Sequence, residues 1–70
     1  MTEIKDIMFE LAEGNPGALR VMIDIVERGR ADLLPVLREQ GLRGAAVWTT
    51  YRDENGGDLD SMMMNLELLK

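Results

Sequence analysis

Apolar residues recur along this chain at intervals of three and four, the spacing that places them on one face of an α-helix. The segments with this spacing are bounded by glycine, proline, asparagine or aspartate, which are residue types that begin and end helices. The pattern predicts five helices, over about residues 3–13, 16–28, 33–40, 45–54 and 59–69. We therefore expect an all-α fold, a compact bundle of about five short helices in a single domain, residues 1–70.

The first two predicted helices meet at the segment Glu13–Leu19, which reads EGNPGAL. Gly14 can adopt the left-handed conformation that ends a helix, Asn15 is a strong N-cap, and Pro16 suits the first helical position. Two residues with almost no side chain complete the first turn, Gly17 and Ala18. Backbone amides left open at such a helix start can bind an anion. The same small residues can instead let a neighbouring helix pack closely, and the sequence allows both interpretations.

Other helix ends are marked by similar signals. Thr2 is the expected N-cap of the first helix, and Asp58 is that of the last. Gly41, with Leu42 after it and Leu37 one turn before it, predicts a Schellman stop with its apolar contact. The second helix is apolar around most of its circumference, so we expect it at the centre of the domain.

The segment 45–54 has two possible structures, because Val47–Tyr51 combines helical spacing with strong β-propensity. A lone strand in an otherwise helical chain would have no partner with which to pair. We therefore favour a helix here and keep a strand as the alternative.

The composition excludes several kinds of chemistry. The 70 residues contain no cysteine and no histidine, which excludes a disulfide, a zinc site of thiolates and imidazoles, and the commonest general base. Ser61, the single serine, has no base in view. We expect a protein that is not an enzyme and that uses no metal or cofactor. A chain this short buries only about 60% of its unfolded surface, so we expect additional support from a homo-oligomer.

The net charge is −5, which argues against nucleic acid as a partner because phosphate binding normally needs a basic face. The 13 acidic residues could instead mimic phosphates and occupy a nucleic-acid-binding protein, although dispersed acids usually only keep a small protein soluble. The chain lacks a run of about 18 apolar residues for a membrane span, and its start does not resemble a basic signal peptide. We therefore expect a cytoplasmic protein.

The first candidate function is the binding of an anionic ligand, such as a signalling (cyclic) nucleotide. Trp48 and Tyr51 lie one helical turn apart and could stack a planar base. Arginines near two helix starts could neutralise its phosphate, together with backbone amides. The candidate ligand-binding residues are Asn15, Gly17, Ala18, Arg20, Arg43, Trp48, Tyr51 and Arg52. The two aromatic residues also fit an ordinary core.

The alternative function is that of a protein-interaction module. Phe9 lies off the apolar stripe of the first helix, and three consecutive methionines give the last helix a pliable surface. The candidate partner interface consists of Phe9, Met62, Met63 and Met64. Methionines of this kind also commonly fill irregular gaps in a core.

Two further motifs carry weaker signals. Residues 36–47 have the spacing of a helix-turn-helix, so a small DNA-binding regulator is another alternative, although its reading helix would be nearly neutral. Residues 53–64 superficially match a calcium loop. Position 6 of that loop, however, is Asp58 where glycine is needed, and position 12 is Met64 where a bidentate glutamate is needed. We interpret these acids as helix ends.

The EGNPGAL junction, the stretch Gly41–Asp53 (GLRGAAVWTTYRD) and the acidic turn before the last helix resemble those of small phage and prophage helical proteins. The resemblance spans most of the chain. It implies a phage accessory protein that acts inside an infected bacterium. Such proteins are often inhibitors of bacterial defence that sequester a nucleotide signal or bind a host protein. No functional residue is carried over from this resemblance.

Overall fold

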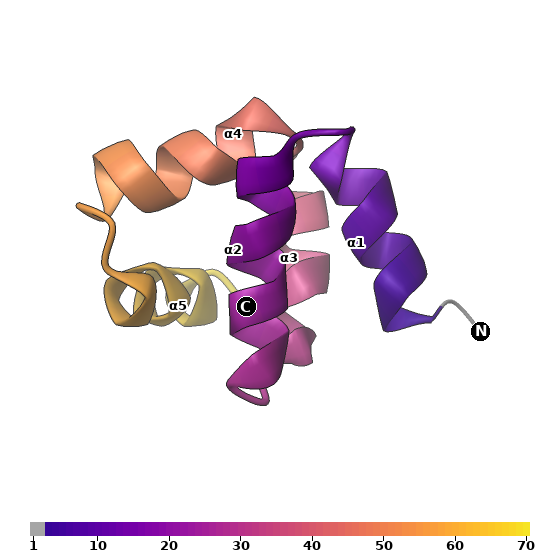
Figure 1. The fold of residues 1–70 in the computed structure, drawn as a ribbon. Helices are drawn as coiled ribbons and strands as arrows, with labels where there is room; N and C mark the ends of the chain where they lie inside the picture. The colour runs from indigo at the N-terminus through magenta and orange to yellow at the C-terminus, as the bar shows by residue number, and fades with distance from the viewer. Residues whose placement is uncertain (1–2) are drawn as a thin grey trace.

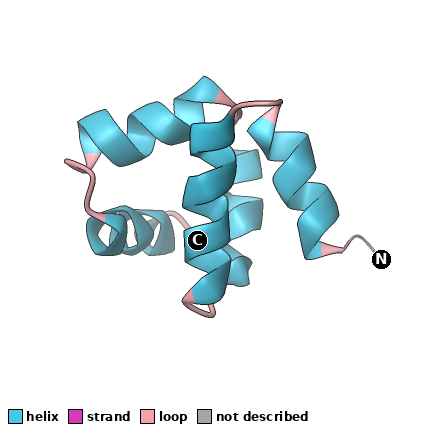
Figure 2. Ribbon diagram, viewed as in Figure 1, coloured by secondary structure: helices cyan, strands magenta, loops and turns pink. Residues whose placement is uncertain are grey.

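The structure, a computed structural model, describes residues 3–70 and confirms the all-helical fold. No strand occurs among these residues (Figure 2), so the segment 45–54 is helical, as the sequence analysis favours. The expected Thr2 cap lies outside the described residues. The elements are α1 (Ile4–Ala12), α2 (Pro16–Glu27), the 3₁₀ turn η1 (Ala31–Leu33), α3 (Leu34–Glu39), α4 (Ala45–Thr49), the π-helical segment η2 (Thr50–Glu54) and α5 (Leu59–Leu68).

The hydrogen bonds at the helix ends confirm the predicted signals. The Asn15 side chain accepts a hydrogen bond from the Ala18 N–H at 2.9 Å, which caps the start of α2. After α3, the Leu42 N–H donates to the Leu37 carbonyl at 2.9 Å across a left-handed Gly41, the expected Schellman stop. The last helix also begins at its expected aspartate cap. Local sequence therefore sets where these helices begin and end.

The apolar helix α2 lies at the centre of the molecule, as its sequence predicts. In Figure 1 it runs between α1 and α5, with α3 behind it and α4 near its first turn. The buried core residues are Leu11, Ala12, Ala18, Val21, Met22, Ile25, Leu33, Leu34, Val36, Leu37, Val47, Leu59, Met62, Met63 and Leu66. Burial of each large side chain contributes roughly 1.5–3 kcal/mol, so packing around α2 holds the helices together.

The start of α4 is joined to the end of α1 by a backbone contact. The Gly44 N–H donates to the Leu11 carbonyl at 2.6 Å. Gly44 has a φ of 52°, a conformation that residues with a Cβ rarely adopt, and a Cβ here would lie 3.0 Å from the Glu13 carboxylate. Glycine therefore lets α4 approach α1 closely, and α4 in turn places Trp48 over the first turn of α2.

The helix that begins with α4 does not stay regular to its expected end, because its second half widens into the π-helical segment η2. The Thr50 hydroxyl donates to the Ala46 carbonyl at 2.8 Å. The Asn55 amide donates to the Thr50 carbonyl at 2.7 Å, and its oxygen accepts from Asn65 at 2.7 Å and from Ser61 at 3.3 Å. Side chains thus hold η2 against α5, and a π-helical turn of this kind often occurs at a functional site.

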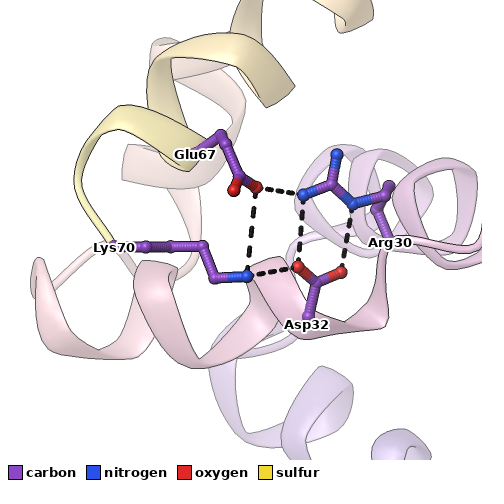
Figure 3. Close-up of polar contacts among 4 residues, drawn as sticks. All are labelled: Arg30, Asp32, Glu67 and Lys70. Carbon is purple, nitrogen blue, oxygen red and sulfur yellow. Dashed lines mark hydrogen bonds and ion pairs between the residues drawn. The ribbon is translucent and has the colours of Figure 1, made fainter.

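A cluster of four charged residues joins the end of α5 to the turn after α2 (Figure 3). Arg30 donates to both Asp32 oxygens, at 3.1 and 3.2 Å, and also pairs with Glu67. The Lys70 ammonium lies 2.6 Å from the Asp32 carboxylate. Hydrogen bonds from Arg30 and then from Lys70 hold the pKa of Asp32 well below its ordinary range, and the same contacts raise the pKa values of Arg30 and Lys70.

Candidate functional site

The structure brings together the aromatic pair and the start of α2, which the sequence analysis assigns to one ligand site. The ring centroids of Trp48 and Tyr51 are 5.5 Å apart, and the ring planes are tilted by 44°. A Cβ on Gly17 would lie 2.9 Å from a ring carbon of Trp48, so the indole rests directly on the glycine. The Ala18 N–H is already bonded to Asn15. Close packing therefore accounts for the small residues here, which is the second of the two interpretations that the sequence allows.

Of the three arginines expected to neutralise a phosphate, two are already paired with acids. Arg20 pairs with Asp24 at 3.5 Å, one turn further along α2. Arg43 pairs with Glu10 of α1 at 3.2 Å. Arg52 is exposed on η2. Nucleotide binding by these residues therefore stays a prediction from the sequence. The structure supports one part of it, the contact between the Trp48 and Tyr51 rings.

The structure separates the three methionines that were expected at a partner interface. Met62 and Met63 are buried in the core, whereas 66% of Met64 is exposed. In this fold Met64 is therefore the one methionine of the three that lies at the surface, and a partner interface on this helix stays a prediction. The reason for the separation is geometric: successive residues of an α-helix differ by about 100° around its axis, so three in a row cannot share one face.

Phe9, the other predicted interface residue, is 67% exposed. It lies beside a hollow of about 210 Å³ where α1 and α2 meet. We call this area the Phe9 surface; its residues are Phe9, Ala12, Gly14, Asn15, Pro16 and Leu19. The sequence points to Phe9 because the residue lies off the apolar stripe. It does not show the hollow, since the hollow arises only where the two helices meet.

A second hollow, of about 280 Å³, lies where η2 and α5 meet, and none of the predicted ligand-binding residues lines it. We call it the η2 groove; its residues are Gln40, Leu42, Thr50, Glu54, Asn55, Met62, Asn65, Leu66 and Leu69. In the sequence, the break Asn55–Gly57 marks a turn. It carries no sign of the widened helix that shapes the groove, so sequence reasoning missed this site.

The structure gives no added support to the helix-turn-helix or to the calcium loop. The helix that would read DNA, α4, has five residues before the backbone widens into η2, which is short for a helix that must lie in a major groove. Across residues 3–70, no three acidic side chains gather closely enough to hold a metal ion. Over the same residues, no helix combines the length and the apolar character that crossing a membrane requires.

Comparison of the chain with models of protein families, with curated proteins and with solved structures finds no match. The resemblance to small phage proteins therefore depends only on the segments quoted for it. The case for a function comes from the two surfaces described above, the Phe9 surface and the η2 groove.

Proposed function

We propose that this protein acts without catalysis, as an interaction module that binds a basic protein segment on the Phe9 surface. The observation that carries the proposal is the exposure of Phe9, the single phenylalanine of the chain, beside an apolar hollow. Burial of such a side chain contributes roughly 1.5–3 kcal/mol, which this fold leaves unused. An exposed aromatic ring next to an apolar hollow is typical of a site that anchors a partner.

The charges around the Phe9 surface favour a basic partner. From Glu3 to Glu13 the chain carries four acids and one lysine, a net charge of −3. Lys5 is paired with Glu3, and Glu10 is paired with two arginines. Asp6 and Glu13 make no ion pair within residues 3–70. A basic segment that approaches α1 is therefore attracted, while an acidic one is repelled.

The proposal includes the context that the resemblance to phage proteins implies. It places the protein in the cytoplasm of an infected bacterium, as an accessory protein that blocks a host protein of bacterial defence. Host proteins that bind nucleic acid have the required basic surfaces. The acids of α1 then occupy the place that phosphates would take, and Phe9 supplies the apolar anchor.

Substitution of Phe9 by alanine tests the proposal. Because the ring is exposed, we expect Phe9→Ala to leave the fold intact, as circular dichroism will show. We expect the variant to bind its partner at least about 10-fold more weakly, the usual effect of removing an aromatic anchor. Proteins captured from a bacterial lysate identify candidate partners, and calorimetric titration of each purified candidate measures the loss.

Leu68→Ala is the matched control, because Leu68 is 78% exposed and lies on α5, away from the Phe9 surface. This variant should bind as the unchanged protein does, and added salt should weaken both. Size-exclusion chromatography with light scattering shows whether a second copy covers the surface instead. The proposal fails if no captured protein depends on Phe9, if the dependent proteins are acidic, or if Phe9→Ala only converts a dimer into a monomer.

A further inference from the structure

The η2 groove is a preformed hollow whose walls are held by hydrogen bonds within the protein. Asn55 bridges η2 and α5, because its side chain bonds at once to Thr50 and to Asn65. Thr50 is in turn bonded back to Ala46. A groove with fixed walls loses little conformational freedom when a ligand enters, which favours binding.

The floor and rim of the η2 groove differ in chemistry. Its floor is apolar: Leu42 and Leu69 expose part of their surface there, and the buried Met62 and Leu66 also belong to the lining. Side-chain amides line the rim, together with the single ionisable residue of the groove, Glu54. An apolar floor with a few polar groups around it is the usual composition of a small-molecule site.

Charge and size both narrow the class of ligand. Glu54 is a carboxylate, and the net charge of the protein is −5, so a cation is attracted and an anion is repelled. The volume of about 280 Å³ lies at the lower end of the range for ligand pockets, roughly 300–1,000 Å³. A nucleotide has the wrong charge for this groove, whereas a short apolar chain with one positive end has the right charge and is small enough to enter it.

We propose that the η2 groove binds a short alkylammonium ion. The alkyl chain lies on the apolar floor, and the ammonium group donates to the Glu54 carboxylate and to the amide oxygens of the rim. This site is separate from the Phe9 surface and involves different residues. Binding here therefore stands or falls independently of the proposed protein partner.

Titration with pentylamine, followed by ¹⁵N–¹H correlation spectra, tests the proposal directly. The chain has four side-chain amides, and three of them line the η2 groove, those of Gln40, Asn55 and Asn65. The fourth, on Asn15, lies at the Phe9 surface and serves as an internal control. We expect saturable shifts of the three groove amides and none at Asn15. Because so small a ligand makes few contacts, the dissociation constant should be on the order of 1 mM.

Two comparisons isolate the role of charge. Pentanol and hexanoate have the same pentyl chain as pentylamine but are neutral and negative, so both should bind more weakly. Glu54→Gln should weaken pentylamine binding by about 2- to 5-fold, the range of an exposed ion pair, and leave pentanol binding unchanged. Asp53→Asn removes the same charge from an exposed residue outside the groove and should bind as the unchanged protein does.

Three results would overturn the proposal. The first is an absence of saturable shifts at the groove amides up to about 50 mM pentylamine, well above the expected dissociation constant. The second is equal affinity for pentylamine and pentanol. The third is an equal effect of Glu54→Gln and Asp53→Asn, because the carboxylate at the rim would then have no specific part. The same spectra show whether each variant is folded.

Discussion

At the scale of single residues, the closest fit described in this protein is that of Trp48 against Gly17. Gly17 lies in the first turn of α2, so it is not required for an unusual backbone conformation. Its missing Cβ instead leaves room for the indole. Alanine would be favoured here by roughly 0.8–1.0 kcal/mol of helix propensity if nothing covered the site. The presence of glycine is therefore explained by its neighbour.

We expect Gly17→Ala to destabilise the fold by about 1–3 kcal/mol, the usual cost of adding a methyl group to a close-packed site. The displaced indole should become more exposed to water, so its fluorescence should shift to longer wavelength. Urea denaturation monitored by circular dichroism measures the loss of stability.

A double-mutant cycle with Trp48→Leu shows whether the indole causes this effect. In the Trp48→Leu background the ring carbons that collide with the new methyl group are absent. The alanine should then cost at least about 0.5 kcal/mol less, a coupling typical of residues in contact. Purely additive effects would mean that the predicted collision is not the source of the destabilisation.

At the scale of the elements, α5 has apolar residues on two sides, which its sequence alone cannot rank. The inner side buries Met62 and Leu66, while the outer side exposes Met64 and Leu68. The spacing of apolar residues along α5 shows that the helix has an apolar stripe on each of these two sides. Only the packing of α5 against α2 and η1 decides which of them enters the core.

Alanine substitutions should separate the two sides of α5. Met62→Ala should destabilise the fold by about 2–5 kcal/mol, because it leaves a cavity in the core. Met64→Ala should change stability by no more than about 0.5 kcal/mol, as is usual for an exposed position. Thermal unfolding of both variants checks this, and equal effects would mean that α5 is rotated relative to the orientation described.

The π-helical segment η2 belongs to the same scale, and local sequence could not predict it. The Thr50 carbonyl is satisfied by the Asn55 side chain, and Asn55 is itself held by Ser61 and Asn65 of α5. The contacts to Ser61 and Asn65 exist only after α5 has folded back onto η2. A pattern read along residues 45–54 therefore yields a regular helix, and the groove that depends on η2 stays hidden.

At the scale of the whole molecule, the helices pack into a body with a radius of gyration of 10.6 Å, close to the value of about 11 Å expected for a globular domain of this length. The cluster of Arg30, Asp32, Glu67 and Lys70 helps to close this body, because it joins the end of α5 to the turn after α2 (Figure 3). Self-association, which the sequence analysis expects from the small size, stays a prediction.

The contribution of this cluster should disappear in acid. The pKa of Asp32 is lowered in the folded protein, so its stabilising effect is present above the ordinary value of 3.8 and is lost as the pH falls below it. Asp32→Asn should therefore be less stable than the unchanged protein at about pH 7, and the difference should shrink steadily as the pH falls from the ordinary value of 3.8 toward the lowered pKa of the folded protein. Urea midpoints measured across this range give the difference directly.

The exposed variant Asp53→Asn is the control, because Asp53 takes no part in an ion pair within residues 3–70. Its stability should follow that of the unchanged protein at every pH. A difference for Asp32→Asn that stays constant down to about pH 2 would contradict the predicted linkage. At alkaline pH, the stabilising contribution of Lys70 is fully present below the ordinary pKa of 10.5. Because folding raises this pKa, the contribution is lost as the pH rises from 10.5 through the raised value.

The sequence by itself determined the helical class, the central place of α2 and most helix ends, because these depend on periodicity and on capping contacts a few residues apart. It also singled out Phe9, Trp48 and Tyr51, whose chemistry is visible without a fold. The tertiary structure decided which methionines are buried, which groups at the start of α2 are already engaged, and where the two hollows lie. The physical reason is that these properties depend on contacts between residues far apart in the chain, which local spacing does not encode.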